Sequence, residues 1–109
     1  EMYQNIQTRG IDGKRRIVKV LPSEESAKGL SKEILNEPDT IAVFLFEKSK
    51  SNGFNIISTH EKINAQEILN SLKTSLNIQG GGNSNMTLGV VHGSLEQIKK
   101  EVEEIVKKY

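Results

Sequence analysis

Apolar residues occur along this chain in two patterns. Some form short continuous runs, and others stand three or four positions apart, as on one face of a helix. Residues 15–21, 41–46 and 54–59 are rich in β-branched or aromatic side chains, which predicts three strands. The run 41–46 contains no polar residue and is typical of a strand buried on both faces, so we expect it at the centre of a sheet. Residues 86–91 predict a fourth, shorter strand, which the glycine within it weakens.

Three further segments carry apolar residues three or four positions apart, which predicts amphipathic helices. Each follows a residue type that caps helix N-termini, namely Ser23, Asn64 and Ser94. Glu67 and Gln97 stand three residues after the second and third caps, as in capping boxes. The apolar positions of the three helices are Ala27, Leu30 and Ile34, then Ala65, Ile68, Leu69, Leu72 and Leu76, then Leu95, Ile98, Val102 and Ile105.

Polar, glycine-containing segments separate these elements. Asn52-Gly53 predicts a tight hairpin turn, because both residues tolerate positive φ. The segment 79–85, Gln-Gly-Gly-Gly-Asn-Ser-Asn, predicts a loop. The resulting order is β-α-β-β-α-β-α, which indicates one layered α/β domain. We expect a mixed sheet of about four strands with the helices packed on it.

The N-terminal residues are the least regular part of the chain. Residues 1–14 are interpreted as a tail or as the end of an upstream linker helix, with Gly10 as its stop. Residues 15–109 are assigned to the single folded domain. A chain of 109 residues has the size of one domain with one core.

Composition excludes several classes of protein. Hydrophobic residues make up 35% of the chain and charged residues 27%, a balance typical of globular domains. The lack of cysteine excludes disulfides, thiolate zinc sites and thiol nucleophiles, and it favours an intracellular protein that we place in the cytoplasm. No apolar run approaches the roughly 18 residues that span a bilayer, and no leader-like segment is expected, so we expect no membrane partner.

The charge balance does not indicate a strong nucleic-acid binder overall. The net charge is +1 and the pI is about 8.2, whereas such domains usually exceed a pI of about 9. Aromatic residues at 5% argue against a platform for stacked bases. Five cations before the first strand and in the predicted hairpin do not pair along a helix: Lys14, Arg15, Arg16, Lys48 and Lys50. If the sheet brings such residues close to the glycines they could hold a sugar-phosphate backbone, the alternative being solubilising turn residues. The four candidate phosphate contacts are Arg15, Arg16, Lys48 and Lys50.

The three consecutive glycines 80–82 are the most unusual feature of the sequence. Glycine costs conformational entropy on folding, so it is kept where the backbone needs positive φ or where something approaches closely. Such a loop can direct N–H groups at a phosphate or carboxylate, although a flexible connector or a close crossing of two chain segments would also use it. The known nucleotide motifs do not fit, because no lysine follows the glycines and a strand rather than a helix comes next.

No group of residues predicts catalysis. His60 and His92 have no metal-ligand spacing, and Asp12 and Asp39 both stand in turn contexts. No G-x-S-x-G nucleophile elbow occurs. We therefore expect no catalytic residue, no metal and no cofactor in this chain.

The segment 78–89 resembles the glycine-rich motif of the DHHA1 family. The closer resemblance is to the C-terminal domain of alanyl-tRNA synthetase, especially the archaeal form, whose motif is roughly G-G-G-R-P-D-M/L-A-Q-x-G. The matching residues are Gly80, Gly81, Gly82, Met86 and Gly89, and the surrounding elements match over most of 15–108. Asn83, Ser84 and Asn85 stand where the family has arginine, proline and aspartate.

This resemblance implies a non-catalytic module that contacts the elbow of alanine tRNA, works with the other domains of a parent alanine–tRNA ligase and pairs subunits in a homodimer. Such a module recognises RNA by shape and backbone. Two alternatives are a domain that serves only homodimerisation, and the substrate-binding half of a DHH-type phosphodiesterase or an alanyl-tRNA editing hydrolase. The nucleic-acid-binding candidates are Gly80, Gly81, Gly82, Asn83, Ser84 and Asn85, with Arg15, Arg16, Lys48 and Lys50.

Overall fold

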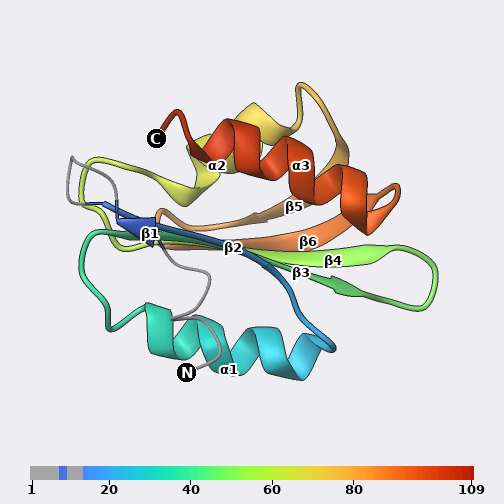
Figure 1. Cartoon of the computed structure of the whole chain (residues 1–109), viewed down its shortest axis with the longest axis horizontal. Coiled ribbons are helices and arrows are strands. Elements are labelled where there is room, and N and C mark those ends of the chain that lie inside the picture. Colours follow the sequence, from blue (N-terminus) through green and yellow to red (C-terminus); the bar gives the residue numbers. More distant parts are fainter. Residues whose placement is uncertain (1–7, 10–13) are drawn as a thin grey trace.

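The computed structural model describes residues 8–9 and 14–109, which form one mixed sheet with helices on both faces (Figure 1). Helix α1 lies on one face, and α2 and α3 lie on the other. The predicted α/β class is confirmed. The elements are β1 Thr8–Arg9, β2 Arg15–Val20, α1 Glu24–Ile34, β3 Thr40–Glu47, β4 Asn52–Ser58, α2 Ala65–Leu72, β5 Asn77–Gly82, β6 Met86–His92 and α3 Leu95–Val106.

The sheet contains two strands more than the four that the sequence predicts. Within the described residues its order is β1-β2-β3-β4-β6-β5, and only the β2–β3 pair is parallel. The additional strands are the short β1 and the glycine strand β5, which lie at the two edges. The helical interpretation of residues 1–7 falls outside the described residues.

Strand β3 occupies the centre of the sheet, as predicted from its continuous apolar run. All its residues except the last are buried. Ile41, Val43 and Leu45 pack into the core beneath α2 and α3. Phe44 and Phe46 pack into the core beneath α1. The run has no polar positions because both of its faces are covered by helices.

The three predicted N-caps are confirmed. Ser23 Oγ accepts a hydrogen bond from Ser26 N at 3.2 Å, and Ser94 Oγ accepts one from Gln97 N at 3.2 Å. The side chain of Asn64 accepts from the second helical residue of α2, at 2.8 Å, rather than from the third as a capping box would require. None of the helices in the described part of the chain is long and apolar enough to cross a membrane.

The predicted Asn52-Gly53 turn is wrong. Residues 48–51 make the turn, closed by a hydrogen bond from Lys48 N to Ser51 O at 2.8 Å, and Gly53 lies inside β4 opposite Phe46. A Cβ on Gly53 would lie 2.2 Å from Phe46 Cε1. The glycine is therefore needed for the aromatic ring that packs across it, a contact that local turn statistics do not contain.

Candidate functional site

The glycine segment is the edge strand of a hairpin and not a loop, contrary to the prediction for residues 79–82. Strand β5 pairs with β6 over its whole length, from Asn77 opposite His92 to Gly82 opposite Thr87. Only residues 83–85 form the turn. The ladder of backbone hydrogen bonds holds the glycines extended despite their low intrinsic preference for strands.

Gly80 and Gly89 stand where β5 and β6 leave no space for a side chain. A Cβ on Gly80 would lie 2.3 Å from the carbonyl oxygen of Leu88 and 2.8 Å from Phe54 Cζ. Gly89 faces Gly80 across the strand pair, and its Cβ would lie 2.1 Å from the carbonyl oxygen of Gln79. The missing side chain at Gly80 makes room for the ring of Phe54, and the missing side chain at Gly89 lets the backbone of β5 approach closely.

Gly81 differs from its neighbours, because no heavy atom of the described residues other than Gly80, Gly82 and Gly81 itself lies within 4 Å of the Cβ that it would carry. Its side-chain direction is opposite to that of Gly80, toward the face that carries α1. Opposite Gly81 stands Leu88, which is 54% exposed. We call this region the open sheet face; it comprises Gln79, Gly81, Met86, Leu88 and Val90.

Helix α1 borders the open sheet face without covering it. The side chain of Asn55 on β4 donates a hydrogen bond to Ser31 Oγ of α1 at 3.1 Å. Lys28 and Leu35 stand three residues before and four residues after Ser31, so they lie on the same side of the helix. The sequence gives no sign of this surface, since it depends on which strands α1 covers.

Within the turn 83–85, Asn83 makes hydrogen bonds to the residues that follow it. Asn83 Oδ1 accepts hydrogen bonds from Asn85 N at 2.9 Å and from Met86 N at 3.0 Å. Asn83 N donates to Met86 O at 2.9 Å. These N–H groups are already bonded, so an anion at the turn would need other donors.

The hairpin also holds the start of α2 in place. The carbonyl of Ser84 accepts from Ala65 N at 2.8 Å, and the side chain of Gln66 donates to Gly82 O at 2.6 Å. Ser58 N on β4 donates to the carbonyl of the last turn residue at 2.8 Å. The turn that sequence analysis assigns to ligand binding thus has a structural role, as it connects β4, α2 and β5.

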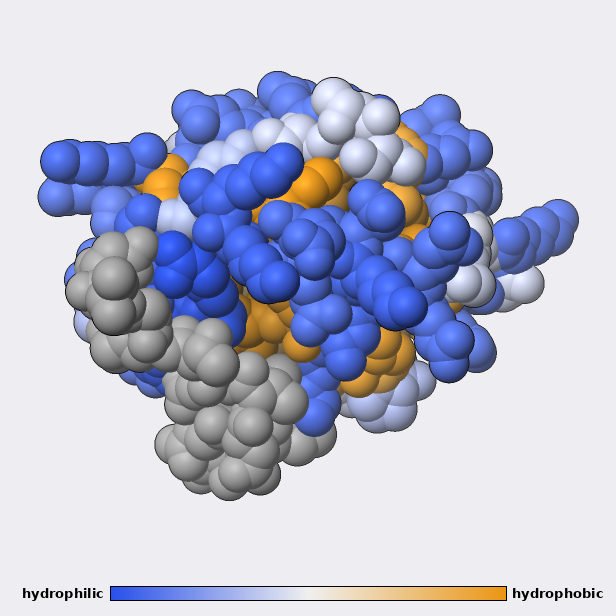
Figure 2. All heavy atoms as spheres, turned by 45° about the horizontal axis from the view of Figure 1, so that its top comes forward, coloured by the Kyte–Doolittle hydropathy of each residue, from blue (hydrophilic) through white to orange (hydrophobic). Residues whose placement is uncertain are grey.

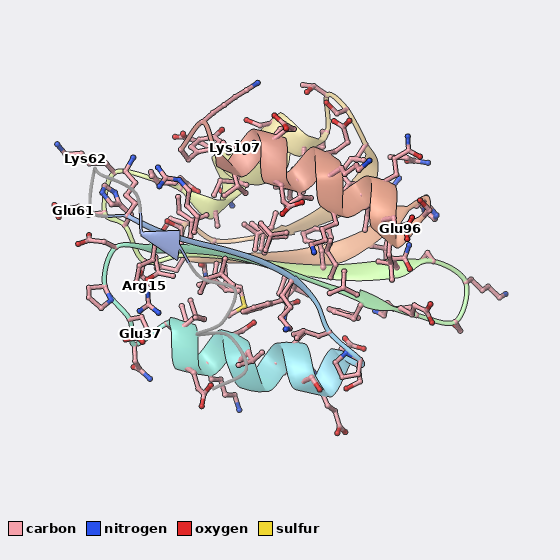
Figure 3. The ribbon with its side chains drawn as sticks, viewed as in Figure 1. Arg15, Glu37, Glu61, Lys62, Glu96 and Lys107 are labelled. Atoms are coloured by element: carbon pink, nitrogen blue, oxygen red, sulfur yellow. The ribbon has the colours of Figure 1, made fainter. Side chains whose placement is uncertain are left out.

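Arg15 and Arg16 lie in β2, at the same end of the sheet as this turn. Arg15 Nη1 is 3.1 Å from Glu37 Oε1, with 11% and 32% of the two side chains exposed. Figure 3 shows this pair on the α1 side. Arg16 Nη1 lies 3.5 Å from the carbonyl of Lys14. Much of the charge of Arg15 is therefore balanced inside the domain.

Lys48 and Lys50 lie at the opposite end of the sheet, in the turn between β3 and β4. Lys48 Nζ is 3.8 Å from Glu24 Oε2, with both side chains more than one third exposed. The structure therefore does not bring the four predicted cations together beside the glycines. The order of strands decides this, because the β3–β4 turn and the β5–β6 turn emerge from opposite ends of antiparallel strands.

A hollow of about 430 Å³ lies beside the β5–β6 turn. Lys62 brings a cation there that sequence analysis missed, because it stands in a connecting loop without a motif. Lys62 N donates to His60 Nδ1 at 3.2 Å, so this histidine serves the loop. Figure 3 shows Glu61 and Lys62 at this end of the molecule. The lining comprises residues 59–64, Glu67, Ser84 and Asn85.

The side that carries α2 and α3 is mostly hydrophilic. Figure 2 shows small hydrophobic areas between polar residues on this side. Within residues 14–109, no three histidine, aspartate or glutamate side chains gather closely enough to hold a metal ion. The remaining candidate surfaces are the edge of β5, the open sheet face and the two ends of the sheet.

Comparisons with known proteins give a fold and no family. No family model matches the chain, and no curated protein matches it. Among solved structures, the chain is similar to the crystal structure of the C-Ala domain from Aquifex aeolicus alanyl-tRNA synthetase, with a TM-score of 0.65 and 19% sequence identity. The similarity covers 85% of this chain and 91% of that one. At this identity, the comparison establishes that the two domains share a fold.

Proposed function

We propose that this chain is a non-catalytic C-terminal module of an alanyl-tRNA synthetase that binds the elbow of alanine tRNA. The observation that carries the proposal is the similarity to the C-Ala domain over nearly the whole of both chains. The motif residues Gly80, Gly81, Gly82, Met86 and Gly89 add support through the sequence resemblance, and in the structure they lie on the neighbouring strands β5 and β6. The partners are then the tRNA and the other domains of a cytoplasmic alanine–tRNA ligase.

The positions of the cations suit an extended RNA backbone better than a single phosphate. Lys48 and Lys50 lie at one end of β3, and Arg15 and Arg16 lie at the other. Seven steps of about 3.3 Å along β3 separate these ends by roughly 23 Å. No single phosphate can contact both ends, so we propose that the cations lie along the RNA backbone and that the module recognises the shape of the elbow.

The glycine hairpin contributes close approach and not an anion nest. Asn83 and Asn85 keep their N–H groups bonded within the turn, whereas Gly81 leaves the open sheet face without a side chain. We propose that the backbone from Gly80 to Asn85 lies against the RNA, with Lys62 as an additional cation in the neighbouring hollow.

A titration of the chain against alanine tRNA, with a bare acceptor minihelix as control, tests the proposal at two salt concentrations. We expect preferential binding of the full tRNA that weakens as salt rises, because neutralised phosphates release counterions. Equal binding of the two RNAs, or no binding of either, would contradict elbow recognition.

Charge reversal identifies the contacts. Lys48→Glu combined with Lys50→Glu should weaken tRNA binding and reduce the salt slope by about 1 for each lost phosphate contact. The matched control reverses Lys100 and Lys108, which are exposed on and just after α3. An equal loss in both double variants would show that only net charge matters.

A second role, homodimerisation, is favoured by the position of β5 at the edge of the sheet. The enzymatic alternative, a substrate-binding half of a phosphodiesterase or an editing hydrolase, would need metal ligands supplied by another chain or domain. Hydrolysis of a phosphodiester or of alanyl-tRNA by this chain with added manganese or zinc would support that alternative.

A further inference from the structure

The outer edge of β5 presents a regular set of backbone donors and acceptors. The hydrogen bond from Asn83 N to Met86 O marks a bonded pair of the β5–β6 ladder. Because bonded pairs alternate in antiparallel strands, residues 77, 79 and 81 bond to β6 and residues 78, 80 and 82 point outward. Gln66 already satisfies the carbonyl of Gly82. Among the described residues, Ile78 and Gly80 have no backbone hydrogen-bond partner on this outer side.

Strand β5 also lacks the features that protect sheet edges from pairing. Its sequence, Asn-Ile-Gln-Gly-Gly-Gly, contains no charged residue and no proline, and its pairing with β6 proceeds without a bulge. The opposite side of the sheet differs, because β2 carries Arg15, Arg16 and Lys19 and pairs with β1. Within residues 8–9 and 14–109, the two edges of the sheet are therefore built differently, and the edge of β5 is suited to accept a further strand.

We propose that β5 pairs antiparallel with β5 of a second copy of this chain and joins the two sheets. This inference deepens the homodimerisation named above and does not depend on tRNA binding. The register places Ile78 opposite Gly80 of the second copy, and Gly80 opposite its Ile78. Four backbone hydrogen bonds then form, since each bonded pair exchanges two. The bond between Gln66 and Gly82 remains intact in this register.

The second copy is favoured because this surface complements itself. The two-fold axis passes between the two Gln79 residues, which are exposed and whose amides can both donate and accept. The backbone is also self-complementary here, because Ile78 and Gly80 each present one N–H donor and one C=O acceptor on the outer side of β5.

The area involved makes this a weak contact. One strand pair buries less than the roughly 1,200 Å² at which stable interfaces begin, so we expect a dimer that dissociates on dilution. Sedimentation of the whole chain at rising concentration should show a reversible monomer–dimer equilibrium. A strictly monomeric chain at every concentration up to the millimolar range would overturn the proposal.

Amide hydrogen exchange by NMR tests the register. The amides of Gln79 and Gly81 should be protected at every concentration, because they bond to β6 within one chain. The amides of Ile78 and Gly80 should gain protection only as concentration rises. Concentration-independent exchange at both positions in a dimeric sample would show that the dimer uses another surface.

Charge pairing at the axis supplies a test of a different kind. Gln79→Lys and Gln79→Glu should each become monomeric, because like charges then meet at the axis, and an equimolar mixture should dimerise again. Gln97→Lys and Gln97→Glu, at an exposed position on α3, are the matched controls and should dimerise like the wild type. Dimers of Gln79→Lys as tight as those of the wild type would refute edge pairing, and the tRNA titration would be unaffected by that result.

Discussion

Replacing Gly80 by alanine adds a methyl group where the domain has no space for it. The new Cβ would lie 2.3 Å from the carbonyl oxygen of Leu88 and 2.8 Å from Phe54 Cζ. Both distances are shorter than 3.0 Å, and Cβ atoms in proteins essentially never approach other heavy atoms that closely. The carbonyl belongs to the β5–β6 ladder and cannot move without loss of a backbone hydrogen bond. Overpacking of this kind costs about 1–3 kcal/mol of the free energy of unfolding.

Gly81→Ala is the matched control, because its Cβ would meet nothing within 4 Å. Replacing a strand glycine by alanine without a clash stabilises by about 0.5–1 kcal/mol, through the lower entropy of the unfolded chain. Gly80→Ala should therefore be less stable than the wild type and Gly81→Ala more stable. Their free energies of unfolding should differ by roughly 1.5–4 kcal/mol, the sum of the two ranges.

Urea unfolding followed by far-ultraviolet circular dichroism measures the difference, since the chain has no tryptophan. We expect a lower midpoint for Gly80→Ala and a slightly higher one for Gly81→Ala, with unchanged m-values. If Gly80→Ala were as stable as the wild type, or if Gly81→Ala lost as much stability as Gly80→Ala, the steric explanation of the glycine strand would be wrong.

Three further predictions concern side chains that hold the sheet ends and the helices. Asn83→Ala removes the acceptor of two backbone N–H groups in the turn and should cost about 1 kcal/mol in urea unfolding, and no loss would show that water replaces these bonds. Arg15→Met should lower the free energy of unfolding by about 1–2 kcal/mol. In a double-mutant cycle, Glu37→Gln should cost little in a chain that already carries Arg15→Met, and additive losses would contradict a direct pair. Ser31→Ala leaves the buried amide of Asn55 without this acceptor and should cost about 1–3 kcal/mol, with a midpoint equal to that of the wild type as the refuting result.

The sequence predicts those features that depend on neighbouring residues in the chain. Ser23, Asn64 and Ser94 act as N-caps because a cap needs only its own side chain and the next few N–H groups. The run 41–46 predicts a central strand because continuous apolar character already implies cover on both faces. The similarity to the C-Ala domain agrees with the resemblance that the glycine motif suggests from sequence.

Local sequence preference does not predict the geometry of the candidate site. Gly53 and Gly80 look like turn or loop residues, yet each makes room for a ring, Phe46 or Phe54, that comes from a different part of the chain. Lys48 and Lys50 are positively charged like Arg15 but lie at the other end of the sheet. Each of these facts follows from the pairing of strands, which is not determined by local preference.

Local sequence therefore determined the helices, most of the strands, the caps and the α/β class, because periodicity and backbone preference act over a few residues. Only the tertiary structure decided that β6 inserts between β4 and β5, that the glycines form an exposed edge and that α1 leaves part of one face open. These features depend on how distant segments bury apolar surface together. That free energy belongs to the whole core and to no single stretch of the chain.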